Sequence, residues 1–258
     1  MDNPLTARHL LPCDPAFDLV IPPAALNFLS DIATFSPAEH PDVLLLRASY
    51  HPQHFCESLF NDFDLSLPAH LHKAVKKRRA EYLASRVCAR FALSLMGIDN
   101  FVLSNDVTRA PVWPLGIIGS LSHTQHRVCL LLAQATCRKL LGVDCEQLIS
   151  SNTADDIQKM IISEKEKAVL QRSGLPFTHA LTIAFSIKES LYKAIFPSLR
   201  EFMDFTSAEI VDCAPAASTI VLRLTRHFST DFPAGRLFRG HVQFQQDEVL
   251  SWVVTPWA

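Results

Sequence analysis

Apolar residues recur along the chain at two spacings, and the change between them separates predicted helices from predicted strands. Helical spacing is clearest over residues 68–96 and again over 175–197. Pro68 and Gly97 suit the first turn and the end of the former helix. Pro197 is expected to stop the latter, because proline cannot continue a helical hydrogen-bond ladder.

Shorter elements are predicted between these long helices. One helix is expected over 153–160, and another over 164–172, where a Ser-x-x-Glu capping box at 163–166 marks the start. The proline-rich segment 1–42 is expected to form loop, with a short helix over 24–32. The sequence therefore predicts mostly irregular structure over residues 1–42 and most of the helices and strands after them.

Short apolar runs predict strands that alternate with the helices. The runs 127–135 and 139–146 are separated by a short link, so they are expected to pair as a hairpin. Residues 109–119 are predicted to form a loop. The predicted strands are 43–49, 100–104, 127–135, 139–146, 220–224, 240–244 and 249–254. This mixture of strands and helices is typical of an α+β fold.

The composition is that of a globular protein of one large or two small domains. The chain has 258 residues, of which 48% are hydrophobic and 19% charged, with a formal net charge of -2. That charge argues against general affinity for nucleic acid or anionic membranes. Seven cysteines without Cys-x-x-Cys spacing favour reduced thiols, and no run approaches the roughly 20 apolar residues of a membrane helix. We expect a cytoplasmic monomer without a secretory signal.

The most informative stretch for chemistry is the strand-like run 142–146. Alternation along a strand puts Asp144 and Glu146 on one side and Val143 and Cys145 on the other. Two carboxylates this close repel each other unless a cation lies between them. Mg²⁺ binds one or two protein carboxylates and completes its shell with water and phosphate oxygens, so this pair indicates a phosphate site.

The predicted helix 175–197 supplies complementary groups. Glu189 and Lys193 are one helical turn apart, and Lys188 lies on the adjoining flank. Together the two segments offer three acids and two bases. Taken alone, however, the run 142–146 would equally suit an ordinary strand with an exposed face.

The helix predicted over 68–96 has a basic edge that contains Arg78, Arg79 and Arg86. Such an edge is commonly a solvated surface, but it can also bind phosphates. His123 is open to two interpretations in the same way, as a core histidine or as a ligand-binding residue.

Four segments carry a resemblance to a known family. They are Gly-Val-Asp-Cys-Glu at 142–146, Phe-Ser-Ile-Lys-Glu-Ser-Leu-Tyr-Lys at 185–193, the arginine-rich segment 78–86, and the segment 109–123 with its Ser-x-His-like end. In this order they resemble the Sfp-like 4'-phosphopantetheinyl transferases, in the branch of enterobactin synthase component D. Cys145 replaces the isoleucine or alanine usual in that family, and we expect it to pack in the core.

The resemblance implies a fold and a reaction. It implies two similar halves, 1–137 and 138–258, each a small antiparallel sheet packed on a long helix, with the active cleft between them. The implied reaction moves the phosphopantetheine arm of coenzyme A to a serine hydroxyl of an apo carrier protein of the acyl, aryl or peptidyl type. It releases 3',5'-ADP and depends on Mg²⁺.

The resemblance also implies roles for individual residues. Lys188 and Lys193 would offset charge on the phosphates, and Glu189 would be either a metal ligand or the base that takes the serine proton. The implied metal ligands are Asp144, Glu146 and Glu189. The implied coenzyme A contacts are Arg78, Arg86, Arg109, Ser122, His123, Lys188 and Lys193.

Two other functions use the same residues. One is a Mg²⁺-dependent phosphohydrolase of coenzyme A or a nucleotide, which would act without a carrier protein. The other is a non-catalytic module that binds coenzyme A or a carrier domain. The sequence does not identify the carrier, which could belong to siderophore or other nonribosomal peptide, polyketide or fatty acid synthesis.

Overall fold

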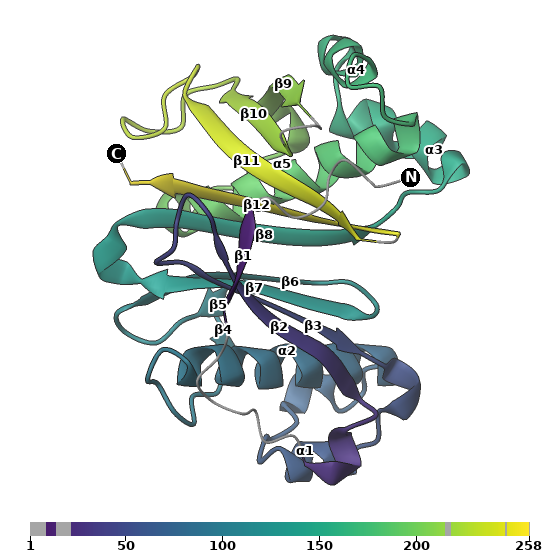
Figure 1. Ribbon diagram of the computed structural model, residues 1–258, viewed down its shortest axis with the longest axis vertical. Coiled ribbons are helices and arrows are strands. Elements are labelled where there is room, and N and C mark those ends of the chain that lie inside the picture. Colours follow the sequence, from purple (N-terminus) through teal and green to yellow (C-terminus); the bar gives the residue numbers. More distant parts are fainter. Residues whose placement is uncertain (1–8, 14–21, 215–217, 246, 258) are drawn as a thin grey trace. The chain divides into compact units, whose positions relative to one another are not determined.

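The computed structural model describes residues 9–13, 22–214, 218–245 and 247–257 (Figure 1). The chain forms two compact units, Leu10–Thr136 and Cys137–Ala258, and His9 belongs to the second. The expected loop over 1–8 and 14–21 lies outside the described residues.

The N-terminal unit is an antiparallel sheet with one long helix against it. The strand order is β1-β2-β3-β7-β6. Helix α2 packs on β7 and β3 through an apolar stripe that includes Ala80, Ala84 and Val87. The strands are β1 Leu10–Cys13, β2 Leu29–Pro37, β3 Leu44–Tyr50, β6 Ile117–His123 and β7 Arg127–Gln134, with the small pair β4 Ser104–Asn105 and β5 Pro111–Val112. The helices are α1 Ser58–Asp62 and α2 Lys76–Ser94, with short 3-10 turns η1 Pro23–Ala25, η2 Pro52–His54 and η3 Ala69–Leu71.

The C-terminal unit repeats this arrangement with a longer helix. Its antiparallel sheet has the order β8-β12-β11-β10-β9, and α5 packs along β8, β12 and β11. Helices α3 and α4 lie beside α5 (Figure 1). The strands are β8 Lys139–Gln147, β9 Ala208–Ala214, β10 Thr219–Leu224, β11 Leu237–Gln245 and β12 Glu248–Pro256. The helices are α3 Ser151–Ile161, α4 Glu164–Gln171 and α5 Phe177–Leu199, with the 3-10 turn η5 Phe205–Ser207. The 3-10 turn η4 Ala135–Cys137 spans the sequence boundary of the two units. The predicted α+β class is thus confirmed.

The structure corrects the predicted hairpin. β7 and β8 lie in different sheets, where β7 pairs with β3 and β6, and β8 pairs with β12. The short link between them contains η4 and Arg138 at a φ of 49°, so the backbone changes direction there. Strand pairing is therefore decided by partners far away in sequence.

Several predicted boundaries were also wrong. Strand β2 occupies part of the helix expected over 24–32, and β6 begins inside the loop expected over 109–119. Pro68 precedes the separate 3-10 turn η3 and not the long helix, so α2 begins later than predicted, at Lys76. Helix α5 runs through Pro197 to Leu199, because a proline so near the end removes only one hydrogen bond of the last turn.

Asp204 caps the turn η5, and its contribution to stability should depend on pH. Its Oδ1 accepts hydrogen bonds from the backbone and hydroxyl groups of Thr206 and Ser207 at 2.8–3.0 Å, and these bonds lower the pKa of the carboxyl group. A depressed pKa in the folded state stabilises the fold above the unfolded pKa, and this stabilisation is lost as pH falls through the folded value.

We therefore expect Asp204→Ala to lower the free energy of unfolding by about 1 kcal/mol at neutral pH. The difference from the unsubstituted protein should shrink as pH falls below about 4. Urea unfolding at pH 7 and at several acidic pH values measures both quantities. An equal difference at all pH values would contradict the assignment.

Candidate functional site

The candidate site is built where α5 crosses β8 and β12 at close range. A Cβ atom on Gly142 would overlap the carbonyl oxygen of Ser190 and would lie 2.8 Å from the backbone nitrogen of Ala194. The hydroxyl of Ser251 hydrogen-bonds those of Ser186 at 2.7 Å and Ser190 at 2.8 Å. Small residues thus let the helix backbone approach the sheet, and hydroxyl groups hold it there.

This close approach brings Lys193 to Asp144. The Lys193 Nζ lies 2.6 Å from Asp144 Oδ1, and the Asp144 side chain is 3% exposed. Burial by itself would lower the pKa of Lys193, but the carboxylate of Asp144, with Cys145 and Glu189, raises it overall. The raised pKa keeps Lys193 protonated at this contact, which joins α5 to β8.

Glu146 and Glu189 lie in the electrostatic field of this pair. Burial, the charge of Asp144 and that of Glu189 raise the pKa of Glu146 to about 8, against the opposing effect of Lys193. Burial and Asp144 also raise the pKa of Glu189, again against Lys193. The charge of Asp144 thus raises the pKa of both glutamates, and a nearby cation would offset that repulsion.

The donor set fits Mg²⁺ without forming a closed cage. In the described part of the chain, no three Asp, Glu, His or Cys side chains are close enough together to hold a metal ion by themselves. Mg²⁺ ordinarily keeps several waters and binds through one or two carboxylates together with substrate phosphates. Asp144, Glu146 and Glu189 supply carboxylate oxygens, which are the donor type that such an ion binds.

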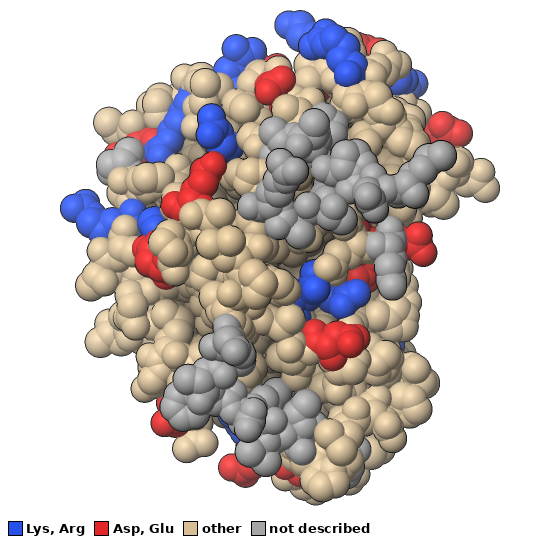
Figure 2. Space-filling view, in the orientation of Figure 1, with Lys and Arg blue, Asp and Glu red and all other residues tan. Residues whose placement is uncertain are grey.

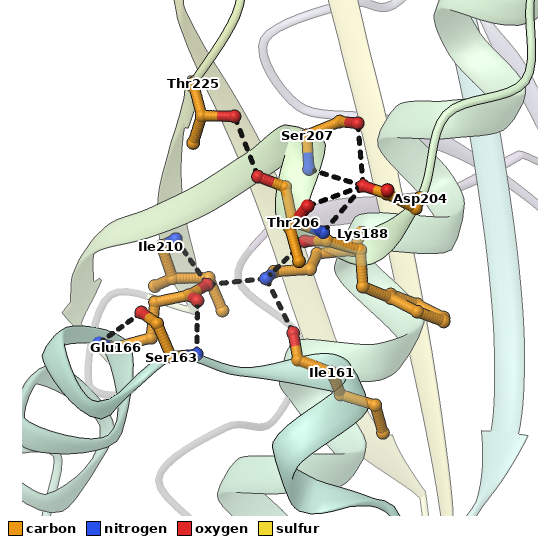
Figure 3. Close-up of polar contacts among 10 residues, drawn as sticks. Ile161, Ser163, Glu166, Lys188, Asp204, Thr206, Ser207, Ile210 and Thr225 are labelled. Atoms are coloured by element: carbon orange, nitrogen blue, oxygen red, sulfur yellow. Dashed lines mark hydrogen bonds and ion pairs between the residues drawn. The ribbon is translucent and has the colours of Figure 1, made fainter.

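Lys188 is not brought to this cluster. Its side chain is 2% exposed, and Nζ lies 2.6 Å from Glu166 Oε1 (Figure 3). It also donates to the carbonyl oxygens of Ile161 at 2.8 Å and Phe205 at 2.9 Å. Because all three of its donors meet these partners, Lys188 has no hydrogen bond left to offer a bound phosphate.

Arg86 is likewise engaged within its own unit. It is buried, and it donates to the Leu103 carbonyl at 2.9 Å, to Ser85 Oγ at 2.9 Å and to Asn105 Oδ1 at 2.6 Å. Burial lowers the pKa of its guanidinium group. Asn105 in turn donates to the carbonyl of Arg109 at 3.0 Å, so Arg86 holds the segment that leads to Arg109.

Two of the other predicted coenzyme contacts, Arg78 and Arg109, are exposed, whereas Ser122 is buried. Arg78 pairs with Glu81 at 3.0 Å on the surface of α2, and its side chain is 54% exposed. Arg109 is exposed in the turn between β4 and β5, with a φ of 69°. Ser122 and His123 end strand β6, opposite Cys129 and Val128 of β7. These four residues lie in the N-terminal unit, whereas Asp144 lies in the C-terminal unit.

The distribution of surface charge agrees with a small net charge. In Figure 2, Lys and Arg side chains lie close to Asp and Glu side chains on the face shown, without a broad area of one sign. None of the helices in the described part of the chain is both long enough and apolar enough to span a membrane.

Sequence reasoning missed two contributors to this region. Glu166 was recognised only as part of a capping box, yet it also pairs with Lys188. Ser251, which holds α5 through two hydroxyl contacts, gave no signal because it lies within an ordinary apolar strand. A buried lysine on an apolar helix is the one signal that could have prompted a search for an acidic partner.

Comparison with known proteins gives consistent matches. Residues 67–133 match a 4'-phosphopantetheinyl transferase N-terminal domain, and residues 140–246 match the 4'-phosphopantetheinyl transferase superfamily. The chain is 39% identical to enterobactin synthase component D of Salmonella typhimurium over 209 residues, which cover 80% of this chain and 85% of that protein. It is 37% identical to the protein of the same name from Salmonella typhi, over 71% of this chain and 75% of that protein. It is also 36% identical to 4'-phosphopantetheinyl transferase Svp of Streptomyces mobaraensis, over 60% of this chain and 63% of that protein.

Proposed function

Because the chain belongs to the 4'-phosphopantetheinyl transferase superfamily, we propose that it transfers the phosphopantetheine arm of coenzyme A to a serine hydroxyl of an apo carrier protein. The observation that carries the proposal is the ion pair of Asp144 and Lys193, which both occupy signature positions and stand beside Glu146 and Glu189. A phosphohydrolase or a non-catalytic binding module is not favoured.

In the proposed reaction the serine oxygen forms a bond to the phosphorus that carries the pantetheine arm. The bond from that phosphorus to the departing 3',5'-ADP breaks, and the serine proton passes to a base. Lys193 would offset negative charge on the phosphates during this exchange. Glu189 would serve in one of its two predicted roles, as the acceptor of the serine proton or as a metal ligand.

We propose that Asp144 and Glu146, with Glu189, hold a Mg²⁺ ion. Such an ion, when bound beside a diphosphate, neutralises charge and orients the phosphate oxygens. The protein's own contribution is to keep these carboxylates partly buried and close to one lysine, so that a cation and an anionic substrate are both favoured there.

We propose that Arg78, Arg109, Ser122 and His123 of the N-terminal unit contact the other phosphates of coenzyme A. The exposure of Arg78 and Arg109 supports this assignment, because their guanidinium groups can reach a ligand. For Arg86 we propose an indirect part, since its donors already hold the segment that leads to Arg109.

The names of the relatives suggest which carriers to test first. Enterobactin synthase component D is the name of several relatives, so we propose a carrier of siderophore-type nonribosomal peptide synthesis as the first candidate. Polyketide and fatty acid carriers remain in the test as alternatives. We further propose a cytoplasmic monomer, in keeping with cysteines that are free among the described residues.

The decisive experiment incubates the protein with Mg²⁺, coenzyme A and a panel of apo carrier proteins. Mass spectrometry of the carriers is expected to show an added phosphopantetheine on at least one of them, with 3',5'-ADP as the second product. Reactions without Mg²⁺, without coenzyme A and with a carrier whose serine is replaced by alanine are the controls. A folded protein that modifies no carrier, or that hydrolyses coenzyme A without one, would overturn the proposal.

A further inference from the structure

Lys188 occupies a signature position, yet all of its hydrogen-bonding capacity is used inside the C-terminal unit. An ammonium group has three donors, and those of Lys188 meet Glu166 Oε1 and the carbonyl oxygens of Ile161 and Phe205. The side chain is 2% exposed. No donor is left for a phosphate, so the role of Lys188 has to be sought in what it holds.

Glu166 is equally well held on its side of the pair. Its Oε1 accepts the backbone N–H of Ile210 at 2.9 Å, and its Oε2 accepts that of Ser163 at 2.8 Å. The Glu166 side chain is 4% exposed. Figure 3 shows the two side chains pointing toward each other within this set of backbone groups. The pair therefore ties α5 to the end of α3, the start of α4, the turn η5 and strand β9.

Stability alone is a poor explanation for such a pair. Moving two charges out of water costs several kcal/mol per ion, and an apolar pair of the same volume often stabilises a protein as well or better. The ion pair adds a geometric constraint on packing, because its hydrogen bonds are all formed in only one arrangement of the surrounding elements. Buried polar groups of this kind can select one packing geometry among several of similar free energy.

The geometry at stake here is the rotation of α5 about its own axis. Successive residues of a helix are about 100° apart, so Lys188 and Lys193 project on well-separated sides of α5, whereas Glu189 and Lys193 are within about 40° of each other. Holding Lys188 on one side fixes where the other two residues point. Gly142 and Ser190 set how closely the helix approaches the sheet, and the Ser251 hydroxyl holds that side of it. Lys188 projects from the far side of the helix, so its ion pair is a second anchor against rotation.

We propose that the buried pair of Lys188 and Glu166 is a positioning device that fixes the rotation of α5, and thereby places Lys193 and Glu189 relative to Asp144. Lys188 and Glu166 are positioning residues, and neither touches the substrates. This inference rests on the proposed transferase function for its kinetic consequences, but its structural claim can be tested separately. It differs from the prediction that Lys188 itself offsets charge on a phosphate.

The test compares four proteins: the unsubstituted chain, Lys188→Met, Glu166→Met, and the double variant. Lys165→Met is a matched control, since Lys165 is an exposed lysine at the start of α4. Each single variant leaves one buried charge without its partner and can lose stability for that reason alone. The double variant leaves no unpaired charge, although the backbone groups of Ile161, Phe205, Ser163 and Ile210 lose these partners. It is therefore expected to unfold below the temperature of the unsubstituted protein but above that of either single variant, and it keeps the test valid if the single variants do not fold.

Three readouts separate positioning from the alternatives. We expect kcat of the double variant to fall by about tenfold to a hundredfold, as small misplacements of catalytic groups do. Its KM for coenzyme A should change much less. A crystal structure of the double variant should show the Lys193 ammonium outside hydrogen-bond distance of Asp144, where it now lies at 2.6 Å. Lys165→Met should match the unsubstituted protein.

Other results would overturn the inference. A double variant with full kcat and an intact pair of Lys193 and Asp144 would make the ion pair merely structural. A large rise of KM for coenzyme A in Lys188→Met, with none in Glu166→Met, would make Lys188 a direct ligand. If the unsubstituted protein modified no carrier at all, the proposed function would fail, while the crystallographic distance would still decide the positioning claim.

Discussion

Asp144→Asn is expected to reduce the rate of phosphopantetheine transfer by at least about a hundredfold while the protein stays folded. The substitution keeps the shape of the side chain but removes the charge that Lys193 contacts at 2.6 Å and that the proposed Mg²⁺ would need. The fold should tolerate it because the Lys193 side chain is 26% exposed and can turn toward water. Steady-state rates with a responsive carrier and thermal unfolding measure the two effects.

A matched control for this substitution is Asp212→Asn. Asp212 is an exposed aspartate of β9 in the same unit, and it has no part in the proposed site. It should transfer phosphopantetheine at the unsubstituted rate. If Asp144→Asn did the same, the metal and the phosphates would have to bind elsewhere, and the site proposed around β8 would be wrong.

Gly142→Ala is expected to destabilise the protein by about 3 kcal/mol and to impair transfer as well. The added methyl group would overlap the Ser190 carbonyl and press on the Ala194 nitrogen, both of which are backbone atoms that cannot rotate away. Helix α5 would have to move off β8, and Lys193 would move with it. Urea unfolding gives the loss of stability, and the transfer assay gives the loss of rate.

Gly240→Ala provides the contrast. Gly240 lies on β11 of the same sheet, but a methyl group there would meet chiefly the end of the Ile187 side chain, which can change its rotamer. Its loss of stability should be clearly smaller than that of Gly142→Ala. Equal losses would mean that any methyl group beneath α5 is harmful, and that the close approach at Gly142 has no special importance.

The parts of the site that follow from local periodicity could be predicted from the sequence. Strand alternation puts Asp144 and Glu146 on the same side, and helical spacing puts Glu189 and Lys193 one turn apart. Both inferences need only a few neighbouring residues. The contact of Lys193 with Asp144 joins two such segments, and the family signatures indicated that they would meet.

The parts that depend on distant partners could not be predicted in this way. Lys188 was predicted to be a second phosphate-binding lysine, because no residue near it in sequence indicates that it pairs with Glu166 of another helix. The short link between 127–135 and 139–146 predicted a hairpin. In the structure β8 pairs instead with β12, which follows about a hundred residues later. Strand β6 was missed in part because Gly119, Ser120 and Ser122 interrupt its apolar pattern.

That pairing has a consequence for biosynthesis. Among the described residues β12 is the only strand that β8 pairs with, and Asp144 lies opposite Ser251 in its register. All four signature segments leave the ribosome before β12 does, so a nascent chain carries every recognisable motif and still lacks the neighbour that holds Asp144 in place. A premature stop codon shortly before β12 would yield a polypeptide that contains all four signature segments and lacks the strand that pairs with β8.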